Sequence, residues 1–270
     1  VAHSFPTRRS SDLMKAEFSI NNYAENTFDV KVERQVKIFS NPEIIRNLHL
    51  ADLEDLQAVG FESENHLYNA GDSAWERSEG LLSIWILGMY NPGDEVVIIL
   101  PYFQGGTGSL GEVVNDTYFG AVPDDRIRTG GGLVFFKGDG KYRSKIGMNW
   151  MRAREILGSY DPESQVLTIV KYNKPEDKAD YVRSMWEIME NPYEGDVVNS
   201  YNDGPPEPGA DPMGPFYELE TSSPVKELAP GERITHIHQT YHIKGEEERL
   251  NRITEKLFNV KIREIRDAFS

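Results

Sequence analysis

Residues 217–242 read YELETSSPVKELAPGERITHIHQTYH and contain two strand-like runs separated by a Pro-Gly turn. Two glutamates alternate along the first run and three histidines along the second, at positions Glu218, Glu220, His236, His238 and His242. Because alternate side chains of a strand point to opposite faces, we expect the three histidines on one face, with Thr240 between them. The chain has 6 His in 270 residues. This face is therefore predicted to concentrate groups that titrate and bind ligands.

Short strands and turns fill the rest of the chain. Alternating or continuous apolar runs occur at 18–20, 28–39, 59–68, 81–90, 96–100, 133–137, 166–172, 181–189, 216–220 and 234–243. Turn sequences such as NNYAEN, NAGD and NPGD separate them roughly every ten to fifteen residues, which is typical of an antiparallel sandwich or barrel. The sequence therefore predicts an all-β fold. We interpret 181–189 (YVRSMWEIM) as a strand, with a helix as the alternative.

Helix signals are clear at the C-terminal end. Residues 246–257 (EEERLNRITEKL) carry acidic residues in the first turn and apolar residues at helical spacing. A second short helix is expected at 262–269, and a weaker helix signal covers 41–56. We expect residues 246–270 to form a helical segment that packs on the sandwich.

The first residues have a different origin. Residues 3–13 (HSFPTRRSSDL) resemble, residue for residue, the translation of a common short-read sequencing adapter. We interpret residues 1–13 as an artefact that takes no part in the fold and expect them to be disordered. The sandwich domain is then predicted to span 14–245, with its N-terminal part missing from this chain.

Composition excludes several classes of function. The formal net charge of −15 repels a phosphate backbone, so no nucleic-acid partner is expected. No run of 18 apolar residues is present, so no membrane-spanning helix is expected. The chain has 0 Cys, which excludes disulfides, thiol nucleophiles and thiolate metal sites.

Further polar positions are candidates for ligand contact. The cluster NSYNDG at 199–204 is typical of an Asn/Asp turn, and its alternative is a site rim that hydrogen-bonds a polar ligand. The basic residues of 141–145 alternate, so an extended backbone would put them on one face, a solvated edge or a sugar contact. Trp85 and Trp186 lie in apolar runs and are assigned to the core. The candidate substrate-binding residues are Asp203, Asn202, Lys141, Arg143 and Trp150.

Residues 65–243 resemble a bacterial family of unknown activity with the galactose-mutarotase-like β-supersandwich. The matching pieces include ENHLYNAGDSAW, GLLSIWILGMYNPGD, FFKGDGKYRSKIG, EILGSYDPESQVLTIVKY and GPFYELETSSPVKELAPGERITHIHQTYH. The resemblance implies an antiparallel supersandwich and a small-molecule carbohydrate ligand. Members of the family begin with an export signal, so it also implies a periplasmic or cell-surface location.

The same resemblance implies a mechanism. In mutarotases a carboxylate removes the proton of the anomeric hydroxyl, and a histidine protonates the ring oxygen. One of the two glutamates would then be the base and one of the three histidines the acid, in an aldose 1-epimerase-like isomerase that needs no cofactor. Because Glu218 and Glu220 lie on the same strand face, their spacing does not choose between them.

Two other hypotheses remain open. The run PGERITHIHQTYH resembles the Gly and His-x-His of a cupin motif, in which His236, His238 and His242 would bind a divalent transition metal such as zinc, iron or manganese. However, His242 stands where a cupin has Glu, and no second cupin motif follows. The other hypothesis is a structural or interaction domain, in which the histidines lie on an exposed convex face rather than in a pocket.

Overall fold

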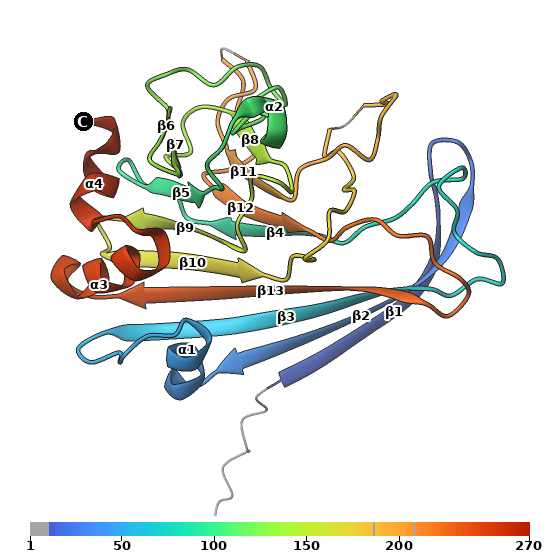
Figure 1. The fold of residues 1–270 in the computed structure, drawn as a ribbon, viewed down its shortest axis with the longest axis horizontal. Helices are drawn as coiled ribbons and strands as arrows, with labels where there is room; N and C mark the ends of the chain where they lie inside the picture. Colours follow the sequence, from blue (N-terminus) through green and yellow to red (C-terminus); the bar gives the residue numbers. More distant parts are fainter. Residues whose placement is uncertain (1–10, 186, 208) are drawn as a thin grey trace, which may run out of the picture.

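Within residues 11–185, 187–207 and 209–270, which the computed structural model describes, the chain forms two antiparallel sheets (Figure 1). The large sheet has nine strands, in the order β1 (Ser11–Asn21), β2 (Thr27–Phe39), β3 (Gln57–Asn69), β13 (Arg233–Lys244), β10 (Val166–Tyr172), β9 (Ile156–Asp161), β5 (Val97–Pro101), β7 (Leu133–Lys137) and β6 (Ile127–Gly130). The small sheet has four, in the order β4 (Trp85–Tyr90), β12 (Tyr217–Ser222), β11 (Val198–Asn202) and β8 (Ser144–Met148). The predicted all-β antiparallel class is confirmed.

The small sheet covers one face of the large sheet. Strand β5 shows the division: Ile98 and Leu100 pack with Ile146 and Leu219 of the small sheet, whereas Ile99 joins a cluster on the opposite face. Because both faces of β5 are covered, its sequence is a continuous apolar run rather than an alternating one. The two sheets therefore enclose one apolar layer, and the large sheet needs a second cover on its other face.

The C-terminal helices supply that second cover. The helices are α1 (Asn41–Asn47), α2 (Thr107–Leu110), α3 (Glu247–Phe258), α4 (Ile262–Arg266) and the 3-10 turn η1 (Asp267–Phe269). Leu250 and Phe258 of α3 and Ile265 of α4 pack with Tyr241 and Ile243 of β13. Figure 1 shows α3 and α4 against one end of the large sheet, which confirms the predicted C-terminal helices. Of the helices described, none is long and apolar enough to cross a membrane.

The strand predicted at 181–189 is wrong. Among its described residues, only Tyr181 makes a strand-like pairing, an isolated bridge to Glu194. Residues 182–185 instead form part of the wall of a surface cavity. Trp186, which was assigned to the core, lies outside the described residues.

Four strands are absent from the prediction, namely β6, β8, β9 and β11. Strands β8 (SKIGM) and β11 (VNSYN) are buried at every position although they carry polar residues. They therefore show neither the alternation of a half-exposed strand nor the apolar run of a core strand. The strand predicted at 81–90 begins only at Trp85.

The N-terminal strand includes part of the segment assigned to the adapter. Residues 1–10 lie outside the described residues. Residues 11–13 belong to β1, where they pair with Lys37, Val36 and Gln35 of β2. The expectation of disorder is therefore wrong for these three residues, because the backbone of β2 offers them a hydrogen-bonding edge.

Candidate functional site

Strand β12 divides its side chains between two different environments. Leu219 packs in the apolar layer between the sheets, and the Tyr217 hydroxyl lies 2.7 Å from the Ser159 hydroxyl of the large sheet. Glu218 and Glu220 alternate with these residues and therefore lie on the outer face of the small sheet. We call this outer surface, formed by Glu218, Glu220, Trp85, Lys145 and Asn199, the carboxylate face.

Glu220 is fixed at the centre of the carboxylate face. Lys145 Nζ of β8 lies 2.9 Å from Glu220 Oε2, and the Trp85 indole N–H of β4 donates to the same oxygen at 2.8 Å. The ammonium group also lies 4.7 Å from the centre of the Trp85 ring. Glu220 has 0% exposure, and its Oε1 has no hydrogen-bond partner. A buried acceptor without a donor is destabilising, so Glu220 Oε1 is free to accept a further hydrogen bond.

Glu218 lies two residues away on the same face and keeps a small exposed surface of 7%. Burial, followed by repulsion from the Glu220 charge, raises the pKa of Glu218 to about 8, with Lys145 acting in the opposite direction. The Glu218 carboxyl is therefore mostly protonated at pH 7 and exchanges its proton close to neutrality.

A loop between β5 and β6 shields the β8 and β11 side of this face. The Tyr118 hydroxyl donates to Asp196 Oδ2 at 2.6 Å, and Asn199 Nδ2 donates to the Tyr118 oxygen at 2.8 Å. Lys145 Nζ lies 5.1 Å from the centre of the Tyr118 ring. Burial raises the pKa of Asp196, despite the hydrogen bonds that it accepts. The loop therefore keeps water away from the ion pair and strengthens its electrostatic interactions.

The face is open on the β4 side. Leu87 and Met89 are exposed at 42% and 58%, and in register they stand opposite Glu220 and Glu218. A cavity of about 280 Å³ begins where Trp85 pairs with Ser222; its remaining lining residues are Ser83, Val182, Arg183, Ser184 and Met185. We call it the Trp85 cavity. It lies beside Glu218 along the strand direction rather than directly over it.

The three histidines lie on the inner side of the small sheet. The Thr221 hydroxyl, from the inner face of β12, lies 2.7 Å from His236 Nε2 and 2.9 Å from His238 Nδ1. His242 Nδ1 lies 3.0 Å from the Thr168 hydroxyl. As predicted, all three rings share one face of β13, but this face points into the layer between the sheets.

Burial keeps these rings neutral. It lowers the pKa of His236 to about 3, with a further contribution from His238, and the pKa of His238 to about 4, with a further contribution from Arg34. Burial also lowers the pKa of His242. Neutral imidazoles have no proton to spare for a ring oxygen at pH 7. Because β12 separates them from the carboxylate face, the structure does not bring the predicted glutamate–histidine pair to one substrate atom.

The histidines do not form a metal site either. His236 and His242 are six residues apart on one strand, which corresponds to about 20 Å at roughly 3.3 Å per residue. Metal–nitrogen bonds are about 2 Å long, so one ion cannot bind both rings. Among the described residues, no three His, Asp or Glu side chains gather closely enough to hold a metal ion. This geometry corrects the cupin-like hypothesis for His236, His238 and His242.

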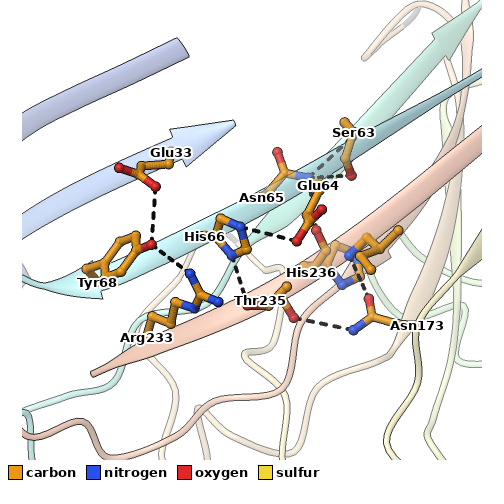
Figure 2. Close-up of polar contacts among 11 residues, drawn as sticks. Glu33, Ser63, Glu64, Asn65, His66, Tyr68, Asn173, Arg233, Thr235 and His236 are labelled. Atoms are coloured by element: carbon orange, nitrogen blue, oxygen red, sulfur yellow. Dashed lines mark hydrogen bonds and ion pairs between the residues drawn. The ribbon is translucent and has the colours of Figure 1, made fainter. Parts of the chain in front are cut away.

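The opposite face of β13 carries a separate polar network (Figure 2). His66 Nδ1 lies 2.9 Å from the Thr235 hydroxyl, and His66 Nε2 lies 3.3 Å from Glu64 Oε1. Thr235 and His236 are consecutive and therefore point to opposite faces of the sheet. On the inner face, Asn65 Nδ2 donates to the His236 carbonyl at 3.1 Å. The network around His66 is partly exposed and lies on the face of β13 opposite to the three histidine rings.

Two of the predicted substrate-binding residues lie at the rim of the carboxylate face. The Tyr201 hydroxyl, on the strand position paired with Glu218, donates to Asp203 Oδ1 at 2.7 Å. The guanidinium of Arg143 lies 4.0 Å from the centre of the Phe119 ring, and that ring centre lies 5.9 Å from the centre of the Tyr201 ring. The structure therefore groups Asp203 and Arg143 with Glu218.

The other three predicted contacts lie elsewhere. Asn202 is buried and hydrogen-bonds the neighbouring turn. Lys141 forms an exposed ion pair with Asp94 at 2.7 Å. The Trp150 indole donates to a backbone carbonyl at 3.2 Å in a separate cavity of about 560 Å³. These side chains support the loops or the surface and do not adjoin the carboxylates.

Residues 5–269 match a family described as a family of unknown function, DUF6786. The chain belongs to the DUF6786 family. Comparison with curated proteins found no match. An Escherichia coli K12 protein described as a "Putative aldose 1-epimerase" is a similar solved structure, with 11% identity, a TM-score of 0.49, and coverage of 91% of this chain and 68% of that chain. A Synechocystis sp. PCC 6803 protein has 8% identity and a TM-score of 0.45, covering 89% of this chain and 64% of that one.

Two residues of the carboxylate face, Lys145 and Trp85, were not among the site residues predicted from the sequence. Lys145 is the ion-pair partner of Glu220. Its alternation with Arg143, at the start of β8, is the sequence feature that could have identified it. Trp85 was assigned to the core, yet it is half-buried and its indole N–H reaches Glu220. Its assignment needs the register of β4 against β12, which no local pattern encodes.

Proposed function

We propose that this DUF6786 protein binds a reducing sugar on the carboxylate face and interconverts its anomers, as an aldose 1-epimerase-like isomerase. The observation that carries the proposal is the arrangement of two carboxyl groups on one strand face. Glu220 is fully buried against Lys145 and Trp85, whereas Glu218 keeps an exposed surface and has a pKa raised to about 8. A carboxyl group whose pKa is strongly raised by burial beside a specific charged partner is typical of an acid–base site. The resemblance of residues 65–243 to a mutarotase-like family supports a sugar as the ligand.

In this proposal Glu218 is the catalytic residue, and Glu220 is a positioning residue. Glu218 keeps an exposed surface, whereas Glu220 has none and is enclosed by Lys145 and Trp85. Burial, together with the charge of Glu220, keeps Glu218 protonated, and Lys145 holds Glu220 in place. The choice between the two glutamates, which their spacing leaves open, therefore falls on Glu218.

The proton transfers balance on one carboxyl group. The Glu218 O–H gives its proton to the ring oxygen of the sugar while its other oxygen takes the proton of the anomeric hydroxyl. The bond between the anomeric carbon and the ring oxygen breaks, and the anomeric carbon becomes an aldehyde. The carboxyl is left protonated, so after rotation about the neighbouring carbon–carbon bond the reverse transfers close either anomer. No histidine is needed, which replaces the glutamate–histidine pair implied by the family resemblance.

Polarimetry tests the proposal directly. Freshly dissolved single anomers of glucose, galactose, mannose and xylose should equilibrate faster with the protein than without it. Glu218→Gln should lower the rate about 100-fold or more, within the range expected for loss of a general acid–base group. Glu64→Gln, a matched change on the outer face of β3, should leave the rate unchanged. Equal rates for wild type and Glu218→Gln would contradict the proposal.

The pH dependence of the rate gives a second readout. The protonated carboxyl is the active form, so the rate should fall as the pH rises through about 8, the pKa of Glu218. A rate that instead falls between pH 6 and 4 would point to an ionised carboxylate as the active form and would overturn this assignment of Glu218.

A further inference from the structure

A larger cavity lies beyond the Trp85 cavity, at the turn between β1 and β2. It has a volume of about 640 Å³, and we call it the hairpin cavity. Val182 lines both cavities, and Leu82 of the hairpin cavity is followed in the chain by Ser83 of the Trp85 cavity. The same two chain segments therefore wall both cavities, and together they form one track along the protein surface.

The track leads back to Glu218 along β4. Met89, Leu87 and Trp85 occupy alternate positions of β4 and stand opposite Glu218, Glu220 and Ser222. From Glu218 to Ser222 is four residues, or about 13 Å at roughly 3.3 Å per residue. That distance exceeds the width of one pyranose ring. A single sugar at Glu218 would therefore leave both cavities unfilled.

The hairpin cavity has the side chains that bind sugar rings. Tyr23 is 84% exposed on its rim. Tyr193 is held in the wall, because its oxygen accepts the Leu81 N–H at 2.8 Å and the Arg77 guanidinium lies 4.7 Å from its ring centre. Asn22 adds an amide group to the lining. Aromatic faces for the C–H side of a sugar, beside planar groups for its hydroxyls, suit a carbohydrate better than a purely apolar ligand.

We propose that the ligand is an oligosaccharide whose reducing-end unit lies over Glu218 and Met89 and whose preceding units extend through the Trp85 cavity into the hairpin cavity. This inference rests on the proposed function for the reaction at the reducing end. It adds the substrate class, a linear glycan of several units rather than a free monosaccharide.

Chain length is the variable that tests this inference. Calorimetric titration of the full chain would compare glucose with the di-, tetra- and hexasaccharides of the α-1,4 and β-1,4 glucose series. In at least one series the dissociation constant should fall at least 10-fold from glucose to the hexasaccharide. Tyr23→Ala should weaken hexasaccharide binding about 3- to 10-fold, the loss expected for one aromatic contact, and should leave glucose binding unchanged. The matched control is Tyr142→Ala, another exposed tyrosine, which does not line the track.

Parallel polarimetry separates the two proposals. Anomer equilibration that depends on Glu218, without any gain of affinity with chain length, would overturn the inference and leave the proposed function standing. A gain of affinity with chain length that is lost in Tyr23→Ala, without equilibration that depends on Glu218, would support the track and overturn the proposed reaction. No binding in either series and no equilibration would overturn both.

Discussion

The carboxylate face and the histidine layer lie on opposite sides of one strand, yet they have opposite electrostatic characters. Glu220 belongs to the outer face, and its neighbour Thr221 contacts His236 and His238 on the inner face. On the outer face the pKa of Glu218 is raised to about 8, close to physiological pH. On the inner face burial moves the histidine pKa values far below it. A concentration of titratable residues in a sequence therefore does not identify the reactive face.

The carboxylate face and the histidine layer also differ in their exposure to solvent. Next to the carboxylate face lie the exposed side chains of Leu87 and Met89 and a cavity. His236 and His238 are exposed at 0% and 2% and lie between two sheets. The carboxylate face is therefore accessible to a ligand. The histidine layer instead connects the two sheets, because the Thr221 hydroxyl of the small sheet contacts both His236 and His238 of the large sheet.

Removing the cation of the carboxylate face is expected to have the largest effect on stability. Lys145→Met leaves the buried Glu220 carboxylate without its partner, and breaking a buried pair in this way destabilises a protein by about 3–5 kcal/mol. Lys141→Met removes only the exposed pair with Asp94 and should change stability by less than about 1 kcal/mol. Urea unfolding at pH 7 measures both. Equal effects would show that the Lys145 pair is no more important than a surface pair.

The buried histidines should affect the stability of the protein in acid and not its activity at pH 7. Unfolded histidine titrates near pH 6.5, whereas His236 and His238 stay neutral in the folded protein until about pH 3 and 4. As the pH falls from about 6.5 towards 4, the unfolded chain binds protons that the folded chain does not. Each histidine should therefore lower the free energy of unfolding by up to about 1.4 kcal/mol per pH unit.

Urea unfolding between pH 7 and pH 4.5 measures this slope. His238→Gln should remove about half of the slope that the two buried rings contribute, whatever its effect on stability at pH 7. An unchanged slope would show that His238 does not stay neutral in the folded protein over this pH range. Polarimetric activity at pH 7 serves as the control, because His238 does not touch the carboxylate face.

The smallest expected effect is a shift in pH dependence. Repulsion from Glu220 helps to raise the pKa of Glu218, and Lys145 acts against it. Glu220→Gln removes the repulsion, so the pKa of Glu218 should fall and the alkaline loss of activity should begin at lower pH. The pH–rate profile of anomer equilibration measures the shift. A merely structural role for Glu220 would lower the rate without moving the profile.

The sequence predicts the parts of this fold in which one face of an element is buried. Strands β2, β3 and β13 alternate because one side faces the core, and α3 shows helical spacing for the same reason. The common face of the three histidines and the common face of the two glutamates follow from spacing alone. Strands β8 and β11 escape prediction because they are buried on both faces while carrying polar residues.

The spacing of residues within one strand does not show which residues of other strands surround each face. The pairing of β12 with β4 brings Trp85 to the carboxylates, and the pairing of β11 with β8 brings Lys145 there. The packing of the small sheet on β13 encloses the histidines. Each of these depends on contacts between residues far apart in the chain. The glutamate–histidine partnership was therefore the natural sequence prediction and the one that tertiary structure corrects.

Carbon-13 NMR of the protein labelled at the glutamate side-chain carboxyl carbons tests, without any substrate, whether Glu218 exchanges its proton near neutral pH. Titration from pH 4 to pH 10, in wild type and in Glu218→Gln, would follow each resolved carboxyl. We expect one glutamate that titrates near pH 8 in wild type and is missing from the variant. If every glutamate titrates below about pH 6, Glu218 is an ordinary carboxylate, and the carboxylate face is not the acid–base site proposed here.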